Sequence, residues 1–297
     1  MGTNFKDMRQ SDQELQNFIF TANEETVSTI IQLMDTIWSI KSRKLKNIYD
    51  QERIPESGSE KRFELAEDLV IHLKYFGSNG IAYGFRKITG QESGVSYLKM
   101  LREVAIFFNK MLKPNLDFPY LGKPLGWVGI KGKKPFNVPR IATVAEYEAL
   151  IVEMLVSEHI RNKSEDELSA AFQEAGLDKE AANQAAFDIL KIGSSGSVLI
   201  FLVQILGKKA VKEIILSILI KLIEKQVGKE AAKKIAQTLS KKITQKTFAR
   251  LVSGVGWILI AYDGLKLASP ATRITVPTLV YISTMRYITV EEETVFA

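Results

Sequence analysis

The sequence predicts an all-α protein. Apolar residues recur at spacings of three and four along most of its 297 residues, which is the period of a helix with one buried face. Helix-capping residues precede several of these stretches, and Gly or Pro follows several of them. We therefore expect an N-terminal helical domain over 1–113, a Pro/Gly/Lys-rich connection over 114–140, and a C-terminal helical domain over 141–297 with basic amphipathic and apolar helices.

The N-terminal part is expected to hold a series of amphipathic helices. Ser11 and Glu14 have the spacing of a capping box, in which each residue bonds the backbone of the other, so a helix is expected to begin at Ser11. Further helices are expected to begin within 21–25 and to cover 60–77 and 96–113, with Gly77 and Pro114 as stop signals.

The connection between the two predicted domains is rich in proline and lysine. Residues 114–139 hold five prolines and four lysines. This composition indicates either an interdomain connection or a short hairpin with Lys131, Lys133 and Lys134 at its turn.

The C-terminal part begins with three further helical patterns. Residues 141–161 carry an apolar stripe, Ser164 and Glu167 form a capping box, and Asp178 has the position of an N-cap. The second and third of these patterns predict a small helical hairpin, a form that serves protein contacts as well as plain structure.

Three uncharged apolar blocks follow, at 192–207, 251–262 and 274–285. Each is shorter than the roughly 20 apolar residues that cross a bilayer, so none predicts a membrane span by itself. The first two blocks could form a buried helical hairpin with residues 208–250 wrapped outside it. In the third block, Pro277 predicts a helix that either kinks or begins there, and a buried arginine beside it would need a carboxylate, for which Asp263 is the nearest candidate.

The basic residues concentrate in one segment. Residues 208–250 contain twelve Lys or Arg and three Glu, so this segment alone exceeds the net charge of +6 of the chain. Its apolar positions form a helical stripe, which is typical of a basic amphipathic helix that binds an anionic membrane or an acidic partner. The alternative is that the lysines solvate the outer face of core helices. The expected surface residues are Lys208, Lys209, Lys212, Lys221, Lys225, Lys233, Lys234, Lys241, Lys242 and Lys246.

No motif in the chain predicts a chemical reaction. There is no cysteine, the two histidines (His72 and His159) lack the spacing of a zinc site, and the glycines of 77–94 do not match a phosphate-binding loop. Glu64, Glu67 and Asp68 have the helical spacing of a solvated face. We therefore expect no enzymatic activity, no cofactor and no metal.

Three passages of the chain are similar to one known family. They are DQELQNFIFTANEETVSTIIQLM at 12–34, LKYFGSNGIAYGFRKITGQ followed by YLKMLREVAIFFNKM within 73–111, and RITVPTLVYISTMR at 273–286. The chain thereby resembles the uncharacterised bacterial YaaW-like family. The matching positions include Gly77, Arg86, Arg273, Pro277 and Arg286. The resemblance implies a bacterial, helical, non-secreted protein and no particular activity.

Two functions fit these observations. The first is a non-enzymatic protein, cytoplasmic or held at the inner membrane, that associates with or inserts into an anionic membrane. The second is a soluble protein-interaction or chaperone-like module whose apolar blocks form the core or a homo-oligomer interface. Nucleic acid is disfavoured as a partner, because the basic segment has few side chains that stack on bases or read their edges. An unrecognised type of enzyme is the third alternative, and it would require a pocket with convergent polar groups.

Overall fold

The structure is a computed structural model that describes residues 5–35, 54–77, 95–111, 138–161, 163–192, 197–226 and 270–293. Within these ranges every regular element is an α-helix, which confirms the predicted all-α fold. The helices are α1 (Phe5–Thr21), α2 (Glu24–Asp35), α4 (Glu60–Gly77), α6 (Tyr97–Met111), α7 (Val144–Arg161), α8 (Glu165–Glu174), α9 (Lys179–Ile192), α10 (Val198–Leu206), α11 (Lys208–Gln226) and α15 (Pro270–Glu293).

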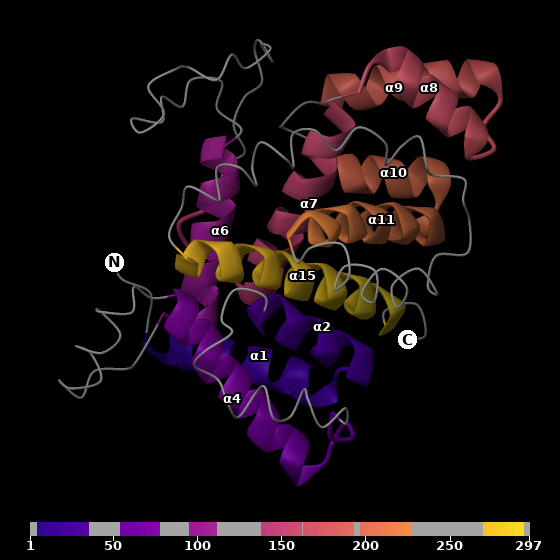
Figure 1. Cartoon of the computed structure of the whole chain (residues 1–297). Helices are drawn as coiled ribbons and strands as arrows, with labels where there is room; N and C mark the ends of the chain where they lie inside the picture. The colour runs from indigo at the N-terminus through magenta and orange to yellow at the C-terminus, as the bar shows by residue number, and fades with distance from the viewer. Residues whose placement is uncertain are drawn as a thin grey trace.

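Helix α15 is the central element of the described fold. It contacts α2, α4, α6, α7 and α11, and Figure 1 shows it crossing the middle of the molecule between α1 and α2 on one side and α10 and α11 on the other. Every residue of 275–285 is buried. A helix segment with no charged side chain can be buried all round when its environment covers every side. Here the neighbouring helices provide it, so the third apolar block is core.

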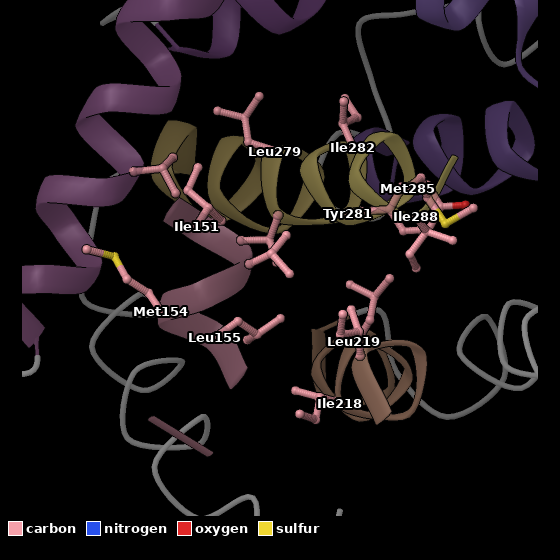
Figure 2. Packing of buried hydrophobic residues seen from close by; sticks show 14 of the residues in the cluster. Ile151, Met154, Leu155, Ile218, Leu219, Leu279, Tyr281, Ile282, Met285 and Ile288 are labelled. Carbon is pink, nitrogen blue, oxygen red and sulfur yellow. The ribbon is translucent and has the colours of Figure 1, made fainter. Parts of the chain in front are cut away.

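Buried side chains of α7, α11 and α15 belong to one hydrophobic cluster, and Figure 2 shows that Leu279 and Ile282 lie on the side of α15 that faces away from α11. Helix α7 supplies Ile151 and Leu155, α11 supplies Leu219, and α15 supplies Leu279 and Ile282. All five are at most 1% exposed. Burying an aliphatic side chain of this size stabilises a fold by about 1.5–3 kcal/mol. These contacts therefore hold the C-terminal helix in place.

The start of α1 corrects the sequence prediction. The helix begins at Phe5, so the capping box expected at Ser11 is wrong. Both polar residues act on another helix instead. Asp12 Oδ1 accepts a hydrogen bond from the Tyr97 backbone N–H at 2.8 Å, and Ser11 Oγ accepts one from the Leu98 N–H at 3.3 Å. Ser11 and Asp12 thus satisfy the free backbone donors at the start of α6.

The polar caps of the C-terminal helices are as predicted. Ser164 and Glu167 form a reciprocal capping box at the start of α8. Asp178 Oδ1 accepts a hydrogen bond from the Ala181 N–H at 2.9 Å, which caps α9. Helices α8 and α9 pack against each other as the predicted hairpin, visible at the upper right of Figure 1.

Pro277 lies inside α15. The helix begins at Pro270, so the alternative that it begins at Pro277 is wrong. Proline has no N–H, so Pro277 cannot donate to the Arg273 carbonyl one turn earlier. Pro270, at the first helical position, removes no intrahelical bond. Asp263, the nearest candidate in sequence to neutralise a buried arginine of this block, lies outside the described residues.

Helix α11 has the predicted stripe. Val211, Ile215 and Leu219 are buried on the stripe, and Leu216 and Glu213 beside it are buried as well. The helix contacts α7, α10 and α15. The first half of α11 is thus amphipathic, with its stripe buried against these helices and Lys208 and Lys209 exposed. The predicted hairpin of 192–207 with 251–262, wrapped by 208–250, stays a prediction, because residues 227–269 lie outside the described residues.

Buried hydrophobic side chains from both predicted domains belong to one cluster. Helix α15, from the C-terminal part, packs on α2 and α4 from the N-terminal part. The predicted domain boundary itself stays a prediction, because residues 112–137 of the 114–140 connection lie outside the described residues.

Candidate functional sites

A short apolar helix, α10, lies partly at the surface. Eight of its nine residues are apolar, and three of these face the core. Ile200, in contrast, is 62% exposed. Gly207 ends the helix with φ +81°, a left-handed conformation that favours glycine, and α11 begins at once with two exposed lysines. We call this region the α10 surface; it comprises Ile200, Phe201, Val203, Gln204, Ile205, Lys208 and Lys209.

A glutamate of α7 fixes the start of α10. Glu153 Oε1 accepts a hydrogen bond from the Val198 N–H at 2.7 Å, and Oε2 accepts bonds from the Leu199 N–H at 3.2 Å and the Ser197 hydroxyl at 2.7 Å. A carboxylate at this end also interacts favourably with the helix dipole. An isolated helix of nine residues is marginal in water. Glu153 therefore stabilises α10 in the orientation that exposes Ile200.

The predicted basic residues divide into three groups. Lys208 and Lys209 are exposed at the start of α11, and Lys212 is half-buried in its first turn. Lys221 and Lys225 belong to the second half of α11. The remaining predicted residues, Lys233, Lys234, Lys241, Lys242 and Lys246, lie outside the described residues.

The described part of the chain also contains a cavity that the sequence did not predict. Its volume is about 640 Å³, within the range of about 300–1,000 Å³ that small-molecule sites occupy. It lies where α1, the first turns of α6, and the start of α7 meet. The lining residues are Gln10, Ser11, Glu14, Leu98, Lys99, Arg102, Arg140, Ile141, Ala142, Thr143, Val144, Glu146 and Tyr147.

The two acidic residues of the cavity bond to the protein itself. Glu146 accepts hydrogen bonds from the Thr143 N–H at 2.7 Å and the Thr143 hydroxyl at 2.9 Å, while Thr143 Oγ1 accepts the Glu146 N–H at 3.2 Å. This capping box lowers the pKa of Glu146. Glu14 lies 3.6 Å from the Arg286 guanidinium. Neither carboxylate is left without a partner inside the protein.

A buried ion pair lies behind the cavity wall. The Arg286 Nε lies 2.8 Å from Glu148 Oε1 and donates to Oε2 at 2.9 Å, and the Arg286 Nη1 donates to the Glu14 carbonyl at 2.9 Å. The Tyr97 hydroxyl donates to Glu148 Oε1. Glu148 is only 4% exposed. The cluster thus joins α1, α6, α7 and α15 through four side chains.

Burial controls the ionisation of this cluster. It raises the pKa of Glu148 to about 7, although Arg286 and the Tyr97 hydroxyl both favour the charged carboxylate. Burial also raises the pKa of Tyr97 well above its usual value. Since Glu148 bonds to Tyr97 and Arg286 from two other helices, its ionisation affects the stability of the fold.

We expect the chain to lose stability as the pH rises from about 4.5 to 7. The pKa of Glu148 is higher in the folded chain than in the unfolded chain, so the folded state holds the extra proton in this window. The loss attributable to Glu148 is about 3 kcal/mol.

Urea unfolding at pH 5 and pH 8 measures this loss, and Glu148→Gln should remove this part of the slope of the free energy of unfolding against pH. The matched control is Glu146→Gln on the same helix; its pKa is lowered, so it should leave the slope above pH 5 unchanged. Equal slopes for wild type and Glu148→Gln would contradict the assignment.

Four of the five positions that match the suggested family lie on described helices. Gly77 ends α4, where a Cβ would lie 2.9 Å from Met100 Cγ and closer still to its Sδ, so any larger residue would require the Met100 side chain to shift. Arg273 and Pro277 belong to α15, and Arg286 forms the ion pair with Glu148. Arg86 lies outside the described residues. The four described positions thus lie on two helices, α4 and α15, that contact each other.

The sequence predicted neither the cavity nor the ion pair, because their residues come from helices that are far apart in the sequence. Glu14, Tyr97, Glu148 and Arg286 come from four helices spread over the chain. Only Arg286 gave a signal, as a charge at the end of an apolar block. Its partner is Glu148, 138 residues away in sequence.

Histidines and carboxylates do not form a metal site in the described ranges. His72 Nδ1 lies 2.7 Å from the Asp68 carbonyl on α4, and His159 is buried on α7. Glu64 and Glu67 are exposed, as the solvated face predicts. No helix within the described residues has both the length and the apolar character to span a bilayer.

Comparison of the chain with protein-family models, with curated proteins and with solved structures gave no match. The resemblance to the YaaW-like family therefore stays a prediction.

Proposed function

We propose that this protein is a non-enzymatic, membrane-associating protein that binds an anionic bilayer surface through the α10 surface. The observation that carries the proposal is the exposure of Ile200 on an almost wholly apolar helix, directly followed by exposed Lys208 and Lys209. An apolar face flanked by lysines is the combination that partitions into the headgroup boundary of anionic membranes.

The charges around the α10 surface favour an anionic partner. Helix α11 carries five lysines and two glutamates, and one of these glutamates, Glu213, is buried. The sequence adds seven further basic residues over 227–250. Each Lys or Arg near an anionic surface contributes about 1 kcal/mol, and salt weakens the attraction.

The apolar part of the α10 surface contributes binding free energy that does not depend on salt. Transfer of a largely exposed isoleucine side chain out of water contributes about 1–2 kcal/mol. Phe187 on α9, which contacts α10, adds a second exposed apolar side chain, with the Lys191 ammonium 3.8 Å from its ring centre. Binding is therefore expected to weaken with salt without disappearing.

Flotation of the full chain with vesicles that contain anionic or only zwitterionic lipid tests the proposal. We expect flotation with anionic vesicles, a loss of about tenfold in partition for Ile200→Gln, and a loss of at least tenfold at low salt for Lys208→Gln combined with Lys209→Gln. The matched controls are Ile71→Gln, an isoleucine 45% exposed on α4, and the exposed Lys61→Gln. These should float like wild type.

Two results would contradict the membrane assignment. The first is the absence of flotation under any salt condition, which leaves the alternative of a soluble interaction module. The second is equal loss for Ile71→Gln and Ile200→Gln, since binding would then not depend on the α10 surface. Charge reversal at Lys233, Lys234, Lys241 and Lys242 tests separately whether the rest of the basic segment contributes.

A further inference from the structure

We propose that the cavity between α1, α6 and the start of α7 binds a small organic anion with an apolar body. This site is distinct from the α10 surface in both residues and helices, so it does not depend on the membrane function. The argument rests on the balance of charge in the cavity, on one buried donor, and on its apolar wall.

The cavity has three cations that no acidic group of the described chain neutralises. Lys99 and Arg102 extend from α6, and Arg140 precedes α7. None of the three forms an ion pair with the described acidic side chains. Glu146 and Glu14, the acids nearby, already serve the α7 cap and Arg286. Glu146 keeps its negative charge, but the three cations outnumber it, so the balance of charge inside the cavity is positive, which favours an anion.

Arg102 provides the most specific feature. Its Nε is buried and has no hydrogen-bond acceptor within the protein. A buried guanidinium N–H without an acceptor is unfavourable. A carboxylate or phosphate satisfies it best, because the planar guanidinium donates two parallel hydrogen bonds to such a group. Because Arg102 lines the cavity, a carboxylate or phosphate is the ligand group that best matches its guanidinium.

Part of the cavity wall is apolar. Leu98, Val144 and Tyr147 line it and are buried, and Ile141, 81% exposed, stands at the rim. The Tyr147 hydroxyl already donates to the Pro139 carbonyl at 2.8 Å, so it offers no free donor to a ligand. Inorganic phosphate alone would leave this wall uncovered. An aromatic or aliphatic carboxylate, or a phosphate monoester of an apolar alcohol, covers it and is large enough to occupy a cavity of about 640 Å³.

Calorimetric titration of the full chain with three probes tests the site: 2-naphthoate, its neutral analogue 2-naphthamide, and inorganic phosphate. We expect saturable binding of 2-naphthoate to one site. The amide should bind at least about tenfold more weakly because it lacks the charge, and phosphate at least about tenfold more weakly because it lacks the apolar body.

Two single variants and one control locate the binding. Arg102→Gln and Arg140→Gln should each weaken 2-naphthoate binding about tenfold, and Lys61→Gln, an exposed cation on α4, should leave it unchanged. Arg140 is exposed, so its variant tests the site even if Arg102→Gln impairs folding. Ile200→Gln should also bind 2-naphthoate like wild type, which separates this test from that of the membrane function.

Several outcomes would overturn the proposal. No saturable binding of 2-naphthoate, or equal binding of 2-naphthamide, would exclude an anion-selective site. Equal affinity for inorganic phosphate would exclude the apolar body as a determinant. Unchanged binding in Arg140→Gln, together with unchanged binding in a folded Arg102→Gln, would place the ligand elsewhere.

Discussion

Replacement of Arg286 by Met is expected to destabilise the fold by about 3 kcal/mol at pH 8. The substitution keeps an apolar stem but leaves the Glu148 carboxylate, 4% exposed, without its cationic partner. It also removes the hydrogen bond to the Glu14 carbonyl. Because burial already raises the pKa of Glu148 to about 7, the loss of Arg286 should raise this pKa further, so at pH 5 the carboxyl group is protonated and needs no cationic partner. The penalty should therefore be smaller at pH 5.

Urea unfolding of Arg286→Met, Glu148→Gln and the double variant measures this pair. Gln at 148 has no charge and retains an acceptor for the Tyr97 hydroxyl, so the double variant should be more stable than Arg286→Met alone. Lys61→Met, on the exposed face of α4, is the control and should change the free energy of unfolding by less than about 0.5 kcal/mol. A penalty for Arg286→Met that is equal at pH 5 and pH 8 would contradict the role assigned to Glu148.

Replacement of Leu279 by Ala is expected to cost about 2–5 kcal/mol of folding free energy. Leu279 is fully buried in α15, the helix that α2, α4, α6, α7 and α11 surround. The smaller side chain leaves a cavity in a packed core, and the lost contacts are not replaced by solvent. Since α15 touches helices from both ends of the chain, the loss should lower the stability of the whole described fold.

Thermal and urea unfolding, followed by circular dichroism, check this expectation. Thr289→Ala is the matched control, because Thr289 lies on the same helix and is exposed. It should change stability by less than about 0.5 kcal/mol. An effect of Leu279→Ala as small as that of Thr289→Ala would contradict the placement of α15 in the core.

The sequence predicted the boundaries of helices more reliably than the contacts between helices. The start of α4 at Glu60 and the caps of α8 and α9 follow from backbone donors that local side chains satisfy. The prediction at Ser11 was wrong because the same hydrogen-bonding capacity can serve a distant helix. Ser11 and Asp12 satisfy the start of α6, and no local pattern distinguishes the two uses.

In the candidate sites, too, local features were predicted and features that depend on several helices were not. Lys208 and Lys209 were predicted as surface residues and are exposed. The cavity and its three unneutralised cations were not predicted, because polar residues such as Lys99 and Arg102 occur on the exposed side of any amphipathic helix. A cavity arises from the angle at which helices meet, and single-helix periodicity does not contain that angle.

By itself, the sequence determined that this chain is helical, where several helices start and stop, and that its positive charge is concentrated in one segment. These properties depend on neighbours along the chain. Only the tertiary structure decided that residues 275–285 form a core helix, that Arg286 pairs with Glu148, and that Ile200 stays exposed on α10. An apolar helix satisfies its own backbone hydrogen bonds in a membrane and in a protein core alike, so its sequence does not reveal what surrounds it. The packing of the other helices supplies that information.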